Sequence, residues 1–315
     1  MKNKHFLTQY IKAEAKRLGF DVCGITHAEP VAGKICKGYR KWLADGNGAD
    51  MDYLSKNIEK RLDPTLLVED VKSIVCVAMN YRPSTFLPKD GYQLAWYAYG
   101  KDYHIVMKEH LQQLFLSIKS QDSAIEGRYF CDTAPVLERY WAERAGLGWR
   151  GKNTQLIIPK QGTSFFLGEL FLNIELEYDK PMDNHCGNCN ACMEQCPTHA
   201  LYTDEETGLH LLNAKLCLSY QTIENKNDIS PIIQKAMGLN IYGCDKCQKA
   251  CPHNKFAQPT RHKEFAASEE LLQMTQKDWD SLTIEKYRTL FKNSAVKRAK
   301  FEGLVRNIKA MKRNT

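Results

Sequence analysis

The stretch CGNCNACMEQCPTHAL, residues 186–201, decides how this sequence is interpreted. Its cysteines have the spacing C-x2-C-x2-C-x3-C-P of bacterial ferredoxins, in which three cysteines hold one iron–sulfur cluster and the fourth binds the other cluster. A second run, C-x2-C-x3-C-P, covers residues 244–252 and is one cysteine short. Cys217 lies between the two runs and supplies the missing thiolate. The region therefore offers eight ligands for two four-iron clusters.

Exchange of the fourth ligands gives a definite assignment. Each two-residue gap lets a short loop surround one cluster, and each Cys-Pro step directs its sulfur toward the other cluster. We expect cluster one to be bound by Cys186, Cys189, Cys192 and Cys251. We expect cluster two to be bound by Cys196, Cys217, Cys244 and Cys247.

A pair of zinc sites is the alternative for the eight cysteines. Structural zinc sites usually combine two separate cysteine pairs around one tetrahedral ion, and the triple run fits that arrangement poorly. Radical chemistry on a sulfonium cofactor would need C-x3-C-x2-C, which neither run contains. The spacing thus favours two electron-carrying clusters.

The composition of the 315-residue chain is that of a globular protein, with 43% hydrophobic and 26% charged residues. No apolar run is long enough to cross a membrane, and the N-terminal segment has no signal-peptide core. We therefore expect a cytoplasmic protein with no membrane association. Thiols stay reduced in that compartment, so Cys23, Cys36, Cys76 and Cys131, which lie outside the runs, are expected to be small core residues.

Positive charge is concentrated in residues 292–315, which hold eight Lys or Arg and one Glu. The whole net charge of +7 falls in this segment, and the remainder is neutral. A basic tail on a redox protein favours a polyanionic partner such as nucleic acid. A solvated basic helix without a partner is the alternative.

The order of patterns predicts three parts. Residues 1–180 alternate between helical and strand-like patterns, including a buried strand at 73–81, helices after Asp102 and Thr133, and a hairpin near Lys160 to Gly162, which indicates an α/β (α+β) domain. Residues 181–258 form a bacterial-ferredoxin-like domain, and residues 259–315 form a basic helical segment. The motif GLGWRG at 146–151 follows a helix instead of a strand, so we interpret Gly146 as a helix C-cap and not as part of a dinucleotide site.

A simple ferredoxin does not need 180 further residues, so the first domain should hold a substrate or a second redox centre. Several motifs here resemble the epoxyqueuosine reductase (QueG) family: EKRLDP (59–64), YGKDYH (99–104), YFCDTAPVLERYWAERAGLGWRGKN (129–153), the ferredoxin run and YGCDKCQKACPHNK (242–255). The resemblance extends over nearly all of residues 1–300.

The resemblance implies a cobalamin-dependent iron–sulfur enzyme that reduces the epoxide of epoxyqueuosine in tRNA to the alkene of queuosine. It implies cobalamin in the first domain, two [4Fe-4S] clusters beside it and tRNA as a partner. Many members have a helical-repeat domain after the basic segment, whereas this sequence ends at Thr315, so we expect its tRNA contacts either to be fewer or to be concentrated on the basic tail. We also expect an external low-potential electron donor and a monomer.

Loss of the epoxide oxygen needs a proton donor, and the resemblance gives that role to Asp132 of the CDTAP motif. An acid that works near neutral pH needs a raised pKa, which we expect from burial against the corrin. The alternative is that Asp132 or Thr133 caps a helix that begins near Ala134.

Further cofactor contacts are implied by the resemblance. For Arg61 the alternative is a surface ion pair, and for the apolar positions it is simple core packing. Tyr103 and His104 could contact cofactor or substrate, although a His at a helix start is often structural, and Lys152 and Asn153 could face the same cavity. The implied cobalamin contacts are Arg61, Ala95, Asp132, Leu156, Leu167, Ser219 and Asp245.

Three further functions remain open on the sequence alone. A reductive dehalogenase-like enzyme would act on a small molecule. A pure electron-transfer protein would hold iron and sulfide but no cobalamin. An iron–sulfur RNA-binding protein without catalysis would keep its function after Asp132→Asn.

Overall fold

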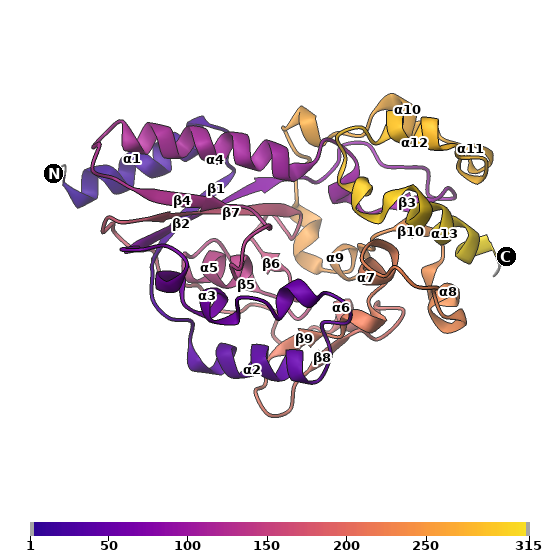
Figure 1. Ribbon diagram of the computed structural model, residues 1–315, viewed down its shortest axis with the longest axis horizontal. Coiled ribbons are helices and arrows are strands. Elements are labelled where there is room, and N and C mark those ends of the chain that lie inside the picture. Colours follow the sequence, from indigo (N-terminus) through magenta and orange to yellow (C-terminus); the bar gives the residue numbers. More distant parts are fainter. Residues whose placement is uncertain (1–2, 313–315) are drawn as a thin grey trace.

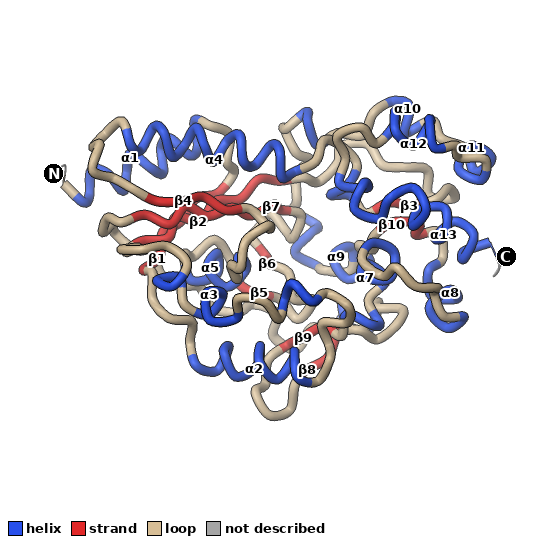
Figure 2. Tube along the Cα trace, viewed as in Figure 1, coloured by secondary structure: helices blue, strands red, loops and turns tan. Residues whose placement is uncertain are grey.

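The computed structural model describes residues 3–312, in which a central sheet is covered by helices and followed by cysteine-rich loops and a helical end (Figures 1 and 2). The sheet is four-stranded and antiparallel throughout, with the order β1-β2-β7-β4. The domain predicted as α/β (α+β) for residues 1–180 therefore has an α+β architecture, and we call it the α+β part. Its elements are α1 (Lys4–Arg17), β1 (Val22–His27), α2 (Gly33–Ala44), α3 (Ile58–Leu62), β2 (Ser73–Asn80), β3 (Gln93–Leu94), α4 (Tyr103–Lys119), β4 (Gly127–Phe130), α5 (Glu138–Arg144), β5 (Trp149–Arg150), β6 (Leu156–Ile157) and β7 (Phe165–Leu172).

Helices cover both faces of this sheet. Helices α1 and α4 pack on one face, and α5 packs on the other (Figure 1). All eight residues of β2 are buried. A strand buried on both faces has no polar side, which is why the sequence of β2 is a continuous apolar run without alternation. The predicted strand at 73–81 is confirmed.

The predicted hairpin near Lys160 is only partly correct. The turn exists, with positive φ at Lys160 and Gly162 and a bridge between Ile158 and Gly162. However, β6 pairs with β5, while β7 pairs with β2 and β4. The two strands beside the turn therefore belong to different sheets. Gly146 has φ +74° just after α5, as expected for a helix C-cap.

The cysteine-rich part contains short elements separated by loops. They are α6 (Ala191–Glu194), β8 (Leu201–Thr203), β9 (His210–Leu212), α7 (Leu218–Ile223), α8 (Pro231–Met237), β10 (Asn240–Tyr242) and α9 (Lys246–Lys249). Strand β10 pairs in parallel with β3 of the first part, and the indole N–H of Trp42 in α2 donates to the carbonyl of Leu212 at 2.6 Å. The cysteine-rich part is thus attached to the α+β part by backbone pairing and by side-chain hydrogen bonds.

Four α-helices of the described chain follow the cysteine-rich part, and the last of them packs onto α7, α8 and β10. They are α10 (Glu269–Leu272), α11 (Gln276–Asp280), α12 (Ile284–Leu290) and α13 (Lys300–Lys312). Helix α13 buries Leu304 and Ile308, and the amide of Asn307 donates to the carbonyls of Thr222 and Ile241. Its Arg306 donates to three carbonyls of the cysteine-rich part. Part of the basic tail therefore has a structural role. The predicted domain borders at residues 180 and 258 stay a prediction.

Within residues 3–312, none of the helices combines the length and the hydropathy that crossing a bilayer requires.

Candidate active site and cluster-binding loops

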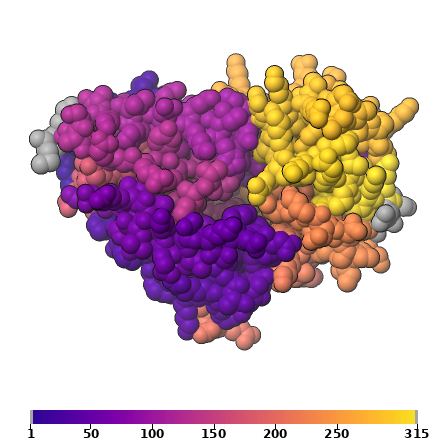
Figure 3. All heavy atoms as spheres, viewed as in Figure 1, coloured from indigo at the N-terminus to yellow at the C-terminus, as the bar shows by residue number. Residues whose placement is uncertain are grey.

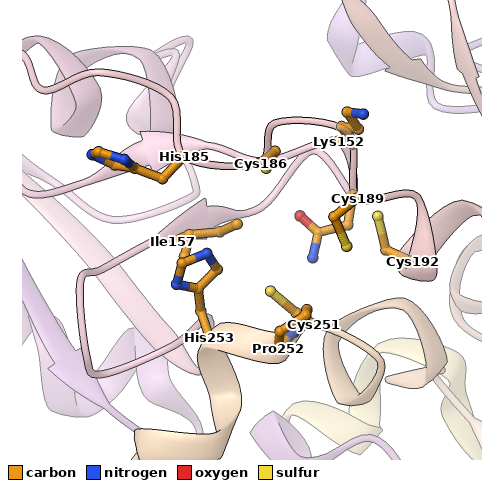
Figure 4. Close-up of a pocket in the computed structure, with 10 residues that line it drawn as sticks. Lys152, Ile157, His185, Cys186, Cys189, Cys192, Cys251, Pro252 and His253 are labelled. Atoms are coloured by element: carbon orange, nitrogen blue, oxygen red, sulfur yellow. The ribbon is translucent and has the colours of Figure 1, made fainter.

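The four cysteines assigned to cluster one surround a single pocket. Cys186, Cys189, Cys192 and Cys251 line it, and Figure 4 shows the sulfurs of Cys189, Cys192 and Cys251 pointing into the same space. Three of these residues come from the loop before α6 and from α6 itself, and Cys251 follows α9, at least 59 positions later in the chain. The fold thus brings the fourth cysteine of the second run to the first three of the first run.

The other four cysteines also lie together. Burial raises the pKa of the Cys247 thiol, and the neighbouring Cys244, Cys217 and Cys196 raise it further. Cys217 directly precedes α7, where the backbone N–H groups of Ser219 and Tyr220 favour its thiolate and partly oppose the increase in pKa. The two groups match the crossed scheme, and the ligand roles themselves stay a prediction.

The local geometry suits a polynuclear cluster. Cys186, Cys189, Cys192 and Cys251 line one pocket from two separate segments of the chain. Donors point at individual sulfurs, because the N–H of Ala200 lies 3.3 Å from Cys196 Sγ and the indole N–H of Trp149 lies 3.5 Å from Cys186 Sγ. Such N–H···S contacts favour thiolates and tune cluster potentials.

Asp132 lies on an irregular loop between β4 and α5. Helix α5 begins at Glu138, and its N-cap position is Leu137. The helix-cap interpretation of Asp132 and Thr133 is therefore wrong, because neither residue stands at the start of that helix. Asp132 has φ +58°, a left-handed conformation that is uncommon for residues other than glycine. Its backbone N–H donates to Glu138 Oε1, which holds the loop against the start of α5.

Two side chains from the start of α4 donate to the Asp132 carboxylate. The Tyr103 hydroxyl lies 2.5 Å from Asp132 Oδ2, and His104 Nε2 lies 3.1 Å from the same oxygen. His104 Nδ1 lies 2.8 Å from Oδ1 of Asp102, the N-cap residue of α4. The Tyr103 ring stacks on Phe166 with a centroid distance of 4.4 Å. The network is therefore fixed at one end by a helix cap and at the other by a core ring.

The charged forms of His104 and Asp132 stabilise each other. Burial opposes protonation of His104, but hydrogen bonds to Asp102 and Asp132 outweigh it and raise the His104 pKa to about 9. Burial also opposes ionisation of Asp132, yet the hydrogen bonds from His104 and Tyr103 lower its pKa. The expected raised pKa of Asp132 is thus not found. At neutral pH the proton is on His104 Nε2, next to Asp132 Oδ2.

Two glutamates behind Asp132 were missed by the sequence interpretation. Burial, followed by the negative charge of Asp132, raises the pKa of Glu138 to about 7. Glu169 in β7 is 0% exposed, and burial raises its pKa well above the ordinary value. Within residues 3–312 neither oxygen of Glu169 has a hydrogen-bond partner. A charged residue inside the apolar run FFLGELFL was the available signal.

The structure places the remaining predicted cofactor residues in two settings. Ala95, Leu156 and Leu167 are buried, at 3%, 3% and 9% exposure. Arg61 is also buried, and its guanidinium lies 3.4 Å from the Tyr53 carbonyl, so the surface ion pair proposed for it is wrong. In the part of the chain that the structure describes, Arg61 Nε is buried and has no hydrogen-bond partner. Buried polar atoms are normally hydrogen-bonded, so a polar group of a bound ligand would fit here as the acceptor.

Ser219 and Asp245 lie beside the second cysteine group. The Ser219 hydroxyl is 3.5 Å from the Cys244 carbonyl, and the Asp245 carboxylate accepts the Trp96 N–H at 2.8 Å. Between them, Gly243 has φ +68°, and a Cβ there would lie 2.5 Å from the Cβ of Ala95. Only glycine allows this approach, which joins the cysteine loop to the Ala95 segment. Lys152 and Asn153 line the cluster-one pocket instead of the Asp132 network.

Comparisons with known proteins agree with this arrangement. A family model described as "Epoxyqueuosine reductase QueG, DUF1730" matches residues 61–133, which include Arg61, Tyr103, His104 and Asp132. A model described as "4Fe-4S double cluster binding domain" matches residues 185–254, which include all eight clustered cysteines. The epoxyqueuosine reductase of Cellulophaga algicola is 40% identical over 311 residues, which are 99% of each chain. The chain belongs to the epoxyqueuosine reductase family.

Solved structures of epoxyqueuosine reductase share the fold. One is bound to a tRNA-Tyr epoxyqueuosine-modified stem loop, with TM-score 0.87, 28% identity, and coverage of 99% of this chain and 82% of the other. Another, from Bacillus subtilis, has its catalytic Asp loop swung out of the active site, with TM-score 0.88 and the same identity and coverage. The family confirms the predicted enzyme class and the two [4Fe-4S] clusters; the roles of individual residues in this family member stay predictions.

Proposed function

We propose that this chain reduces the epoxide of epoxyqueuosine in tRNA to the alkene of queuosine, with cobalamin and two [4Fe-4S] clusters as cofactors. The observation that carries the proposal is the Tyr103–His104–Asp132 network, which lies in the part of the chain that matches the epoxyqueuosine reductase model. Removal of an epoxide oxygen as water breaks two C–O bonds and consumes two electrons and two protons. The eight clustered cysteines would hold the clusters that deliver the electrons, and the Asp132 network would deliver protons.

The hollow between the two halves of the molecule is the proposed cofactor and substrate site. Figure 3 shows the surface hollowed where the α+β part meets the cysteine-rich and helical parts. The Asp132 side chain is 55% exposed, so it can reach a substrate there. The buried Arg61 Nε, without a partner among the described residues, suits a polar group of a large cofactor. Cobalamin would be held by Arg61, Ala95, Asp132, Leu156, Leu167, Ser219 and Asp245.

When bound, cobalamin would supply a low-valent cobalt that passes electrons to the epoxide. The chain's own residues would supply position and protons. Tyr103 and His104 orient the Asp132 carboxylate, and the proton on His104 Nε2 is one hydrogen bond away from Asp132 Oδ2. Asp132 would then hand this proton to the departing oxygen as general acid. The pair titrates as a unit, so a low pKa of Asp132 in the resting protein is compatible with this role.

A tRNA partner is supported by the solved relative that binds an epoxyqueuosine-modified tRNA stem loop. In this chain, Lys292, Lys297, Lys300 and Lys309 are exposed on the last helical segments. Exposed lysines of this kind would bind phosphates and make the affinity fall with added salt. We further propose that the enzyme works in the cytoplasm as a monomer and receives electrons from an external low-potential donor.

The test is an assay of anaerobically purified protein after reconstitution with iron, sulfide and cobalamin. The proposal expects about eight iron and about one cobalt per chain. It also expects dithionite-driven conversion of epoxyqueuosine in a tRNA stem loop, measured by mass spectrometry of the digested nucleosides. Full loading without conversion would overturn the proposal. Eight iron with no retained cobalt would instead favour an electron carrier.

A further inference from the structure

Positive charge surrounds the cysteines assigned to cluster one. The pocket that these cysteines line also contains Lys152, His185 and His253. A second cavity shares Cys251 and Pro252 with that pocket, and it is lined further by Arg82, Trp96, Lys249 and Lys255. Among the described residues, no Asp or Glu lines either cavity. We call the second cavity the basic groove.

The floor of the basic groove is rigid and partly aromatic. The Trp96 ring lies between two cations, with Arg82 Cζ 5.5 Å and Lys249 Nζ 4.7 Å from its centroid. The backbone N–H of Trp96 donates to the buried Asp245 carboxylate, and this bond fixes the backbone that carries the ring. Phe86 packs on Trp96 at 5.2 Å between centroids and is 44% exposed. The groove therefore offers cations together with exposed aromatic surface.

The groove leads to the first of the two cysteine groups. Cys251 lines both cavities and is the predicted fourth ligand of cluster one. The cysteines of cluster two lie beside Asp245 and Ser219, which are two of the proposed cobalamin contacts. Electrons that arrive at the groove would enter cluster one first and continue inward through cluster two.

We propose that the basic groove is the electron-entry surface, and that it docks an acidic low-potential electron-carrier protein of the flavodoxin or ferredoxin type. The proposal rests on the proposed function, because it names the surface that delivers electrons to that reaction. Redox encounters bury small interfaces and depend on complementary charge for their association rate. The exposed Lys249 and Lys255 supply the charge, and Cys251, the predicted cluster ligand, lines the same groove.

Two alternative roles for the cations of the groove are weaker. Cations that only balance the negative charge of a cluster would be buried against it, whereas Lys249 and Lys255 are exposed. A tRNA backbone would also bind these cations. However, phosphate binding gives no reason for the groove to end on Cys251, while electron transfer does.

The test compares two variants with equal changes in charge. The first combines Arg82→Gln with Lys255→Glu and leaves Lys249, which is near Asp245, unchanged. The control combines Lys16→Gln in α1 with Lys235→Glu in α8, both exposed and outside the lining of the groove. Affinity of each cluster-loaded protein for an acidic flavodoxin is measured by calorimetry at low and high salt. Stopped-flow absorbance follows reduction of the clusters by the reduced flavodoxin.

The groove variant should bind flavodoxin about tenfold more weakly at low salt, a loss of about 1.4 kcal/mol. This difference should shrink at high salt, because surface charges are screened. Cluster reduction by flavodoxin should slow in parallel, while dithionite-driven reduction and affinity for the tRNA stem loop stay unchanged. The control should behave as the parent protein.

Equal flavodoxin affinity and equal reduction rates in the groove variant and the parent would overturn the proposal. A matching loss of tRNA affinity would also overturn it and would identify the groove as a nucleic-acid contact. Failure of the parent protein to convert epoxyqueuosine with dithionite would contradict the proposed function, and the flavodoxin binding comparison would still give its own answer about the groove.

Discussion

His104 Nε2 lies 3.1 Å from Asp132 Oδ2, and the opposite nitrogen of the same ring lies 2.8 Å from Asp102 Oδ1. The imidazolium is thus shared by two carboxylates, one of which caps α4 while the other is 55% exposed. The Nε2 proton of the imidazolium therefore faces Asp132, the more exposed of the two carboxylates. His104, at the start of α4, is therefore the proposed source of the proton that Asp132 transfers.

The pH dependence of activity should follow His104. Its pKa of about 9 means that the proton-bearing form is lost as the pH rises through that value. Dithionite-driven single-turnover rates should therefore be flat near neutral pH and fall above about pH 9. In His104→Gln the rate at neutral pH should drop about tenfold or more, and the alkaline limb should disappear. An unchanged pH profile in His104→Gln would show that the ring does not supply the proton.

The same histidine should contribute to stability. A His whose pKa is raised on folding stabilises the protein fully below its unfolded pKa of about 6.5, and the contribution is lost as the pH rises through about 9. Urea unfolding should show that His104→Gln costs more stability at pH 6 than at pH 9.5. Equal costs at both pH values would contradict the ionic interpretation.

Glu169 should also make stability fall as the pH rises, starting from a lower pH than His104. Its pKa is raised by burial, so the folded protein binds a proton that the unfolded chain releases above about pH 4.5. Stability should therefore fall as the pH rises from that value toward the folded pKa. Glu169→Gln should flatten this slope, measured by urea unfolding between pH 5 and 8. Glu194→Gln, at an exposed position, is the matched control and should keep the parental slope.

The crossed cluster scheme predicts which of the two clusters is lost when a given cysteine is replaced. Cys217→Ala should reduce iron from about eight to about four per chain, and Cys251→Ala should do the same for the other cluster. Electron paramagnetic resonance of the reduced variants should show two different residual signals. Cys36→Ala, outside both groups, should keep all the iron. Identical residual signals in the two cluster variants would contradict the assignment.

Features with a local or periodic signature could be predicted from the sequence. The spacing of the cysteines was enough to group Cys251 with Cys186 and Cys217 with Cys244, although these partners are far apart in the chain. The apolar run of β2 was recognisable because both faces of that strand are covered. Local patterns could not reveal that β6 pairs with β5, because strand pairing depends on tertiary packing.

The acid network was beyond sequence reasoning for a similar reason. Asp132 precedes an apparent helix, and the cap interpretation failed because α5 begins only at Glu138, where Glu138 binds the Asp132 N–H. His104 and Asp132 are 28 positions apart and meet only in the fold. Consequently the direction of the Asp132 pKa shift could not be predicted either, since it depends on that contact.

The most direct test of the account is single-turnover reduction of an epoxyqueuosine-containing tRNA stem loop by Asp132→Asn. The variant should carry the same iron and cobalamin as the parent, and it should bind the stem loop with the same affinity, because only the acid is changed. We predict a rate at least about 100-fold lower than the parental rate. A fully loaded Asp132→Asn protein that converts the stem loop at the parental rate would contradict the account.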